Sequence, residues 1–260
     1  MMTDLFSLKA RTAIVTGGSR GIGKMIAQGF LEQGAKVYIT ARKAPACDQA
    51  AEELSAYGEC ISLPHDLSTL EGIDAFAAEF ETHESGLDIL VNNAGAAWGE
   101  PFDEFPEAGW DKVMDLNVKS PFFLAKRLHK LMKAKASEAN VGKMINIASI
   151  DGIRINPWET YSYQASKAAM IHLTRRMAAR LIQDQIAVSG IAPGAFPSEM
   201  NKAARDHGDA ISSMIPAKRV GRDQDMAGAA VFLASRAGDY VIGDTLAVDG
   251  GVAYCSLPTI

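Results

Sequence analysis

The sequence has few cysteines, no long apolar run and no excess of positive charge. Its 260 residues include three cysteines, Cys47, Cys60 and Cys255, which cannot all pair and whose spacing does not suit a metal site. We therefore expect reduced thiols and no metal centre. No run approaches the roughly 18 apolar residues of a membrane span, and the first residues lack the basic and apolar regions of a signal peptide. These absences predict a cytoplasmic protein without a membrane segment.

The charge balance is mildly acidic. Thirty-one Asp and Glu against 26 Lys and Arg give a formal net charge of -5, which argues against nucleic acid or anionic lipid as a partner. The 48% of hydrophobic and 22% of charged residues are ordinary for a globular protein. A chain of this length can bury a large core without disulfides.

Short apolar runs alternate along the chain with longer segments of helical period. The runs predict strands at 12–16, 37–41, 60–63, 89–92, 144–148, 186–191 and 245–248. The periodic segments predict helices at 22–33, 46–57, 69–83, 107–135, 163–184 and 223–235. Such alternation predicts parallel strands with right-handed crossovers and helices on both faces. Without a linker, repeat or low-complexity tract, residues 1–260 are expected to form a single Rossmann-type, doubly wound α/β domain of about seven strands.

The least regular segment, 194–220, is rich in Pro, Gly, Ser and Asp. Long irregular segments in compact domains are often lids or binding loops, so we predict a substrate lid at 195–220. A surface insertion without a role in binding is the alternative.

A glycine-rich turn follows the first predicted strand. Residues 14–23 read Ile-Val-Thr-Gly-Gly-Ser-Arg-Gly-Ile-Gly, and an amphipathic helical segment comes next. Glycines let the backbone approach a pyrophosphate closely, and the start of the helix offers free N–H groups to that anion. This stretch provides the first predicted cofactor-binding residues: Gly17, Ser19, Arg20, Gly21, Ile22 and Gly23.

The end of the second predicted strand indicates which dinucleotide binds. It reads Thr40-Ala41-Arg42-Lys43, without the carboxylate that an NAD site places there to bind the ribose 2′-hydroxyl. Arg42 and Arg20 can instead bind a 2′-phosphate, because a guanidinium donates to two oxygens at once. We therefore expect NADP(H), with solvated residues at a helix start as the alternative for Arg42 and Lys43.

Tyr163 and Lys167 lie four residues apart and share one face of a predicted helix. Hydride transfer to a ketone leaves an alkoxide that needs a proton donor, and the pKa of a free tyrosine is near ~10. An ammonium ~4 Å away at an effective dielectric of ~20 is worth roughly 4 kcal/mol, or about 3 pKa units. We therefore expect Lys167 to bring the pKa of Tyr163 close to neutrality. Tyr161 lies off the face of Lys167 and is expected to line the pocket.

Two further polar residues, Ser149 and Asn117, occupy positions that indicate a role in the site. Ser149 follows the fifth predicted strand, at the sheet edge where open α/β folds bind ligands, although a lone serine there is usually a turn residue. Asn117 lies inside the predicted helix 107–135, four residues before Pro121, which has no N–H. We expect a kink that leaves the Asn117 carbonyl free, with a kink of no chemical consequence as the alternative.

Five motifs occur together: Thr16-Gly17-x-x-x-Gly21-x-Gly23, Asn92-Asn93-Ala94-Gly95, Ser149, Tyr163-x-x-x-Lys167 and Pro193-Gly194. Their order and spacing resemble those of the short-chain dehydrogenase/reductase family, and the resemblance runs from Leu8 to Gly251. Within that family, residues 17–23 and 191–198 are most similar to bacterial NADPH-dependent 3-oxoacyl-[acyl-carrier-protein] reductases, in particular those of the rhamnolipid-biosynthesis type.

The resemblance implies roles for individual residues. Tyr163 would be the proton donor and acceptor and would also contact the cofactor, Lys167 would lower its pKa and bind the nicotinamide ribose, and Ser149 would bind the substrate oxygen. The Asn117 carbonyl would hold a water that passes protons to Lys167. The implied further cofactor contacts are Asp66 and Leu67 at the adenine, Asn93, Ala94 and Gly95 beside its ribose, and Pro193, Gly194, Phe196 and Ser198 at the nicotinamide. The family also implies a homotetramer.

The residues expected around the site are mainly apolar: Trp98, Ile150, Ile155, Trp158, Phe196, Met200 and Met214. An apolar pocket suits an acyl chain, although core or interface packing explains such residues equally well. A basic face could receive an acidic acyl carrier protein, or could only be solvated: Lys126, Arg127, Lys130, Lys133, Arg175, Arg176 and Arg180. Asp184 stands where fatty-acid reductases often have a basic residue, which counts against docking.

Three functions are therefore considered. The first is NADPH-dependent reduction of a 3-oxoacyl thioester, carried on CoA or on acyl carrier protein. The second is a short-chain reductase for another ketone, sugar or polyol. The third is a dinucleotide-binding sensor without turnover, which the presence of all four expected catalytic residues disfavours. The sequence does not identify the substrate, its chain length or the pathway.

Overall fold

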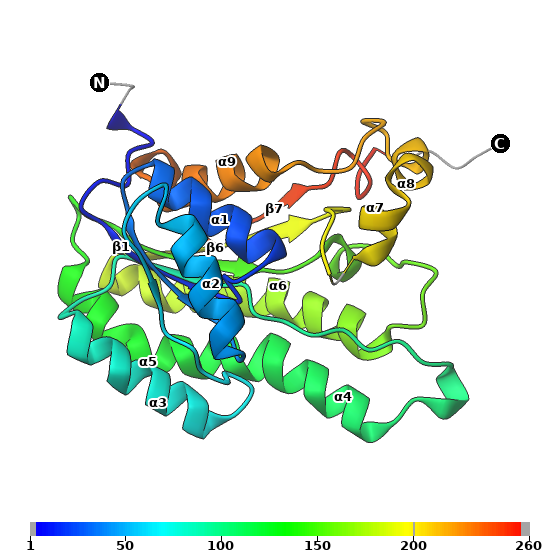
Figure 1. Ribbon diagram of the computed structural model, residues 1–260, viewed down its shortest axis with the longest axis horizontal. Coiled ribbons are helices and arrows are strands. Elements are labelled where there is room, and N and C mark those ends of the chain that lie inside the picture. The colour runs from blue at the N-terminus through cyan, green and yellow to red at the C-terminus, as the bar shows by residue number, and fades with distance from the viewer. Residues whose placement is uncertain (1–3, 200, 256–260) are drawn as a thin grey trace.

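The computed structural model describes residues 4–199 and 201–255, and these contain one sheet of parallel strands (Figure 1). The strands are β1 Thr12–Thr16, β2 Lys36–Thr40, β3 Cys60–Ser62, β4 Ile89–Asn92, β5 Gly142–Ile147, β6 Ile186–Pro193 and β7 Thr245–Val248. Their spatial order is β3-β2-β1-β4-β5-β6-β7. The predicted Rossmann-type α/β fold is confirmed. Its order reverses between β1 and β4, which is where such sheets bind dinucleotides.

Helices cover both faces of the sheet (Figure 1). One face carries α1 Gly21–Glu32, α2 Ala44–Leu54 and α9 Asp223–Ala234, and the other carries α3 Leu70–His83, α5 Ser120–Lys135 and α6 Tyr161–Leu181. Ala13 and Val15 of β1 pack in the first of these cores and Ile14 in the second. The strands read as continuous apolar runs because both of their faces are buried. None of the helices in the described part of the chain has the length and apolar character needed to span a membrane.

The predicted helix 107–135 is divided by a turn of π-helix. It consists of α4 Glu107–Met114, the π-helical turn Asp115–Lys119 and α5. Pro121 has no N–H with which to continue the regular bonding to the Asn117 carbonyl. The ladder widens there, and the Ser120 N–H bonds to the Asp115 carbonyl five residues back. The predicted irregularity takes the form of this π-helical turn, which contains Asn117.

The segment 194–220 is more regular than its composition predicts. It contains α7 Lys202–Asp206 and α8 Gly208–Met214. The Asn201 side chain accepts a hydrogen bond from the Ala204 N–H at 3.1 Å, and Ser198 Oγ accepts one from the Asn201 N–H at 3.0 Å. Ser198 and Asn201, which are typical of loops, therefore cap the start of a short helix. Helices as short as α7 and α8 contain too few turns for a helical period to be recognised in the sequence.

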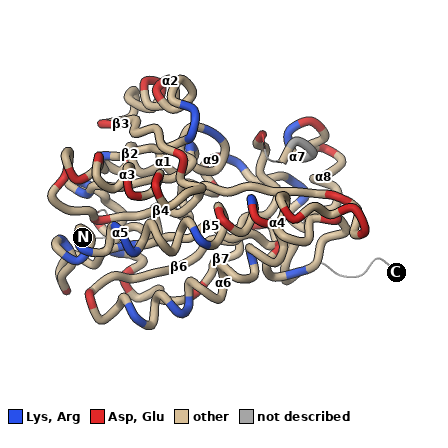
Figure 2. Tube along the Cα trace, turned by 90° about the horizontal axis from the view of Figure 1, so that it is seen from below, with Lys and Arg blue, Asp and Glu red and all other residues tan. Residues whose placement is uncertain are grey.

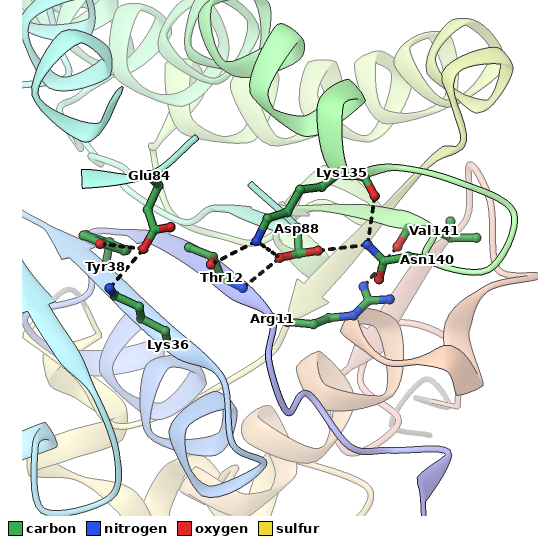
Figure 3. A network of polar contacts seen from close by, with 9 residues as sticks. All are labelled: Arg11, Thr12, Lys36, Tyr38, Glu84, Asp88, Lys135, Asn140 and Val141. Carbon is green, nitrogen blue, oxygen red and sulfur yellow. Dashed lines mark hydrogen bonds and ion pairs between the residues drawn. The ribbon is translucent and has the colours of Figure 1, made fainter. Parts of the chain in front are cut away.

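A polar network holds the strand starts together at the amino-terminal edge of the sheet (Figure 3). The buried carboxylate of Asp88 accepts hydrogen bonds from the Thr12 N–H at 2.9 Å, Asn140 Nδ2 at 3.0 Å and Lys135 Nζ at 3.1 Å. Two open hollows on this edge, both lined partly by Arg11, contain none of the residues predicted for the site. This edge is structural, and the predicted chemistry lies at the opposite edge.

Candidate active site

The turn between β1 and α1 forms a cradle for an anion. Gly17 and Gly21 have φ angles of 65° and 51°, a backbone conformation that favours glycine. A Cβ at Gly23 would overlap the Gly17 carbonyl oxygen and lie 2.5 Å from Asn93 Nδ2. The N-cap residue, Arg20, makes no capping bond with its side chain, so the first N–H groups of α1 are left for an anion. This geometry fits the pyrophosphate of a dinucleotide.

The cradle is held in place by the segment after β4. Asn93 Nδ2 donates to the Thr16 carbonyl at 2.8 Å, and Thr16 Oγ1 accepts from the N–H groups of Asn93 and Ala94, each at 2.9 Å. The Asn93 side chain is therefore committed to shaping the turn. Thr16 belongs to the recognised motif but was not among the predicted site residues, and its buried hydroxyl is what joins the two segments.

Arg42, which is expected to bind the 2′-phosphate, lies near Asp66, which is expected to contact the adenine. Burial raises the pKa of Asp66, but hydrogen bonds from Ser68 and the nearby charge of Arg42 outweigh that effect and lower it overall. The structure thus brings Arg42 and Asp66 together at the ends of β2 and β3. The Leu67 side chain is buried in the core, so only its backbone is placed to meet an adenine.

Three of the four predicted catalytic side chains meet at the carboxyl end of β5. Lys167 Nζ donates to the Ile147 carbonyl at 2.9 Å and lies 5.5 Å from the centroid of the Tyr163 ring. The Ser149 hydroxyl forms a hydrogen bond with the Tyr163 phenol. Tyr161 is directed elsewhere, because its hydroxyl donates to Glu159 at 2.9 Å.

Burial controls the ionisation of this group. It raises the pKa of Tyr163 to about 12, opposed by the Ser149 hydrogen bond and reinforced by the charge of Asp151. Burial also lowers the pKa of Lys167 to about 8, with Asp151 acting in the opposite direction. The expectation that Lys167 brings the pKa of Tyr163 close to neutrality is wrong for this structure, because burial has the largest effect on the phenol and the ammonium bonds to the Ile147 carbonyl instead. At neutral pH, Tyr163 is a phenol with a proton to donate.

The Asn117 side chain joins the loop after β4 to α6. Its Oδ1 accepts from the Ala96 N–H at 2.8 Å, and its Nδ2 donates to the Ala96 carbonyl and to Ser166 Oγ, each at 2.9 Å. A Cβ at Gly95 would lie 3.2 Å from Asn117 Oδ1 and 3.8 Å from Lys167 Nζ. Asn117 is therefore beside the reacting group, and its side chain is occupied by these bonds; the water at its carbonyl stays a prediction.

The segment after β6 lies against the cradle. Pro193 ends β6, and a Cβ at Gly194 would lie 2.7 Å from the Asp249 Cα. A Cβ at Gly21 would lie 3.2 Å from that of Ser198. The Phe196 ring packs in the hydrophobic core, so only its backbone is placed to meet a nicotinamide. Met200, predicted for the pocket, lies outside the described residues.

Sequence reasoning missed the 3₁₀ turn η4, Ile150–Gly152, which follows Ser149 directly. The Asp151 N–H donates to Ser149 Oγ at 3.1 Å. A Cβ at Gly152 would lie 2.5 Å from the Lys167 carbonyl carbon, so this turn packs directly on α6. Proximity to Ser149 in the sequence was the only available signal.

The comparisons with known proteins agree with this geometry. A family model described as "Enoyl-(Acyl carrier protein) reductase" matches residues 17–253. The rhamnolipids biosynthesis 3-oxoacyl-[acyl-carrier-protein] reductase of Pseudomonas aeruginosa is 46% identical over 253 residues, which are 96% of this chain and 99% of that protein. The chain therefore belongs to the short-chain dehydrogenase/reductase family, as its motifs predict.

A solved structure and a second relative bear on the cofactor and the substrate. The solved P. aeruginosa RhlG/NADP active-site complex superimposes with a TM-score of 0.93 at 45% identity, covering 96% of this chain and 99% of that one. The 5-keto-D-gluconate 5-reductase of Escherichia coli K12 is 37% identical over 256 residues, covering 96% and 98%. The prediction of an NADP(H)-dependent oxidoreductase agrees with these relatives. Both substrate classes that the sequence left open are represented among them.

Proposed function

We propose that this chain uses NADPH to reduce the carbonyl of a 3-oxoacyl thioester to a secondary alcohol. The observation that carries the proposal is an apolar rim at the active-site end, formed by five exposed large side chains. They are Phe102, Ile155, Trp158, Met214 and Tyr254, each with at least 67% of its surface exposed. Exposed apolar patches of this kind mark binding surfaces, and an acyl chain suits this one better than a polyhydroxylated sugar.

Contacts between distant segments place the rim around the reacting group. The loop 153–160, which carries Ile155 and Trp158, connects η4 to α6 and so runs from Ser149 to Tyr163. Arg154 Nη1 donates to the Val252 carbonyl at 3.0 Å. This bond ties the loop to the C-terminal turn that carries Tyr254.

The other parts of the rim adjoin the same turn and loop. A Cβ at Gly250 would lie 2.8 Å from the Ile215 side chain, so the end of α8, with Met214, lies beside the C-terminal turn. The Phe102 ring meets the Tyr161 ring edge to face, with 5.5 Å between centroids. The rim therefore joins the start of α6 to the segment before α4.

The side chains divide the reaction between them. NADPH, when bound, supplies the hydride that is added to the carbonyl carbon. Tyr163 gives its phenolic proton to the carbonyl oxygen, and its pKa of about 12 ensures that this proton is present at neutral pH. Ser149 donates a hydrogen bond to the same oxygen as charge develops there. Lys167 then returns a proton to Tyr163 and regains one from water held by the Asn117 carbonyl.

Reduction of another ketone is the second candidate, and the 5-keto-D-gluconate reductase among the relatives favours it. A sugar acid presents hydroxyls and a carboxylate rather than an apolar chain. Its binding would depend on polar partners, whereas the large exposed side chains of the rim are mainly apolar.

The predicted carrier-binding face is partly neutralised within the chain. Lys133 and Arg180 pair with Asp184 at 2.6 and 2.8 Å, and Arg127 pairs with Asp74 at 2.5 Å. α5 and α6 carry Lys and Arg (Figure 2), and the carboxylates that pair with them come from neighbouring segments, Asp74 of α3 and Asp184 just after α6. Docking of a carrier protein would then rest on Lys126, Lys130, Arg175 and Arg176, so a thioester of CoA is the simpler substrate.

Three further features belong to the proposal. The segment 195–220 would cover the bound substrate, since α8 contributes Met214 to the rim. A homotetramer is supported by exposed apolar side chains on α4, α5 and near β7: Trp110, Phe122, Tyr240, Ile242 and Leu246. Light scattering should then give the mass of four chains. The cytosol remains the predicted compartment.

The substrate is tested by following NADPH absorbance with 3-oxoacyl thioesters of rising chain length, on CoA and on carrier protein. We expect kcat/KM to rise about fourfold for each added CH₂, because each buried CH₂ contributes about 0.8 kcal/mol. Trp158→Ala should weaken this dependence, whereas the equally apolar Phe6→Ala, far from the rim, should not. Turnover of free ketoses or keto acids with none on any thioester would overturn the proposal.

Cofactor preference is tested by Ala41→Asp. The new carboxylate would repel a 2′-phosphate and accept a hydrogen bond from a 2′-hydroxyl, so the ratio of kcat/KM for NADPH over NADH should fall by about 100-fold. Ala41→Asn provides the uncharged control and should change the ratio much less. An unaltered NADPH preference in Ala41→Asp would contradict the placement of the phosphate beside Arg42.

A further inference from the structure

Asp151 is an acidic residue in the turn η4, which packs beside the reacting group. It lies two residues after Ser149 and donates its own N–H to the Ser149 hydroxyl oxygen at 3.1 Å. The next residue, Gly152, is packed so tightly on α6 that a Cβ would lie 2.5 Å from the Lys167 backbone. Backbone contacts on both sides therefore fix the Asp151 backbone relative to Ser149 and Lys167.

The charge of Asp151 acts on both ionisable members of the reacting group. After the dominant effect of burial, it raises the pKa of Tyr163 and opposes the fall in the pKa of Lys167. These side chains flank the place where a substrate carbonyl must bind to receive a proton from Tyr163. A negative charge within Coulomb reach of both is within similar reach of that carbonyl and its neighbouring carbons.

The other charged groups around η4 have different partners. Arg154 donates to the backbone of the C-terminal turn, Glu159 accepts from the Tyr161 hydroxyl, and Asp249 accepts from two N–H groups of the same turn. β6, which also packs on η4, contains no ionisable residue. The remaining ionisable residues of α6 lie beyond Lys167, from His172 onward, or at Tyr161. Asp151 is thus the carboxylate that acts on the reacting pair.

We propose that Asp151 is a specificity-determining residue that excludes substrates with a negative charge close to the reacting carbonyl. A sugar acid carries its carboxylate within a few carbons of the ketone and would be repelled. A 3-oxoacyl thioester is uncharged there, since its phosphates lie at the far end of the pantetheine arm. The inference rests on the proposed function, because it assumes that this site reduces ketones, and it extends that function by naming what the site rejects.

The test compares wild type with Asp151→Asn, using the charge-retaining Asp151→Glu and the distant exposed Glu81→Gln as controls. The uncharged probe is a 3-oxoacyl N-acetylcysteamine thioester and the anionic probe is 5-keto-D-gluconate. We expect wild type to favour the thioester. In Asp151→Asn, the ratio of kcat/KM for thioester over keto acid should fall by about tenfold, allowing for partial solvent screening. Both controls should keep the wild-type ratio.

The pH profile supplies a readout that a structural role of Asp151 would not move. In alcohol oxidation the rate rises with pH as Tyr163 loses its proton, and the charge of Asp151 raises the pKa of Tyr163. Removing that charge lowers this pKa, so the rising limb should shift by about one pH unit toward acid in Asp151→Asn. The Asp151→Glu limb should stay in place.

Failure of the proposed thioester reduction and failure of the proposed role of Asp151 give different results. If wild type reduces no thioester, the proposed function fails, and the pH comparison is made with whichever uncharged ketone wild type reduces. If Asp151→Asn keeps both the substrate ratio and the pH limb of wild type, the inference is overturned even though thioester reduction stands. A wild type that prefers the keto acid overturns it as well.

Discussion

Tyr163→Phe should lower kcat for carbonyl reduction by about 10²–10⁴-fold, the range that a positioned proton donor contributes. The substitution removes only the hydroxyl, which holds the transferable proton and meets Ser149. The ring remains to pack beneath the Lys167 ammonium. NADPH binding, followed by its fluorescence, should therefore stay within about twofold of wild type while turnover collapses.

Tyr161→Phe is the matched control for this prediction. It removes the same atom two residues away, but the Tyr161 hydroxyl donates to Glu159 rather than meeting the reacting group. Its kcat should remain within about threefold of wild type, since it loses only one exposed hydrogen bond. A Tyr163→Phe variant as active as Tyr161→Phe would show that the proton comes from elsewhere.

Gly23→Ala should reduce affinity for NADPH by about 100-fold or more, because the added methyl group cannot be accommodated. Its Cβ would overlap the Gly17 carbonyl oxygen and lie 2.5 Å from Asn93 Nδ2. Backbone cannot move aside as a flexible side chain can, so the cradle and the first turn of α1 must separate. Binding is measured by titration of NADPH fluorescence, with circular dichroism to confirm that the chain remains folded.

Gly228→Ala in α9 is the control, because a Cβ there meets nothing within 4 Å. It should leave NADPH affinity unchanged and raise stability by about 1 kcal/mol through the better helix propensity of alanine. Wild-type affinity in Gly23→Ala would mean that the glycine turn does not shape the cofactor site.

The fold and most of the site could be predicted because they depend on local patterns. Alternating apolar runs located each strand to within two residues, and fixed spacing identified Tyr163 and Lys167. The irregularity in helix 107–135 could be predicted from Pro121, because proline lacks a backbone N–H in any tertiary context. These features need no knowledge of which segments pack together.

The features that were missed depend on tertiary packing. The pKa of Tyr163 is raised rather than lowered because burial, which spacing does not reveal, dominates its surroundings. Phe196 and Leu67 stay predicted cofactor contacts through their backbones alone, because tertiary packing buries both side chains in the core. The place of Asp151 beside the reacting pair depends on the packing of η4 on α6, a contact between segments that no local pattern describes.

The two edges of the sheet are built from different kinds of contact, and this separation bears on how such proteins diversify. At the amino-terminal edge Asp88 joins β1 to the ends of α5 and its following turn, far from the rim. The rim itself comes from the segment before α4, the loop 153–160, α8 and the C-terminal turn, which no strand pairing requires. New substrates can therefore be acquired through exchange of peripheral loops while the scaffold is inherited intact. This arrangement accounts for relatives of similar sequence that act on different substrates, one on a 3-oxoacyl group and another on a keto sugar acid.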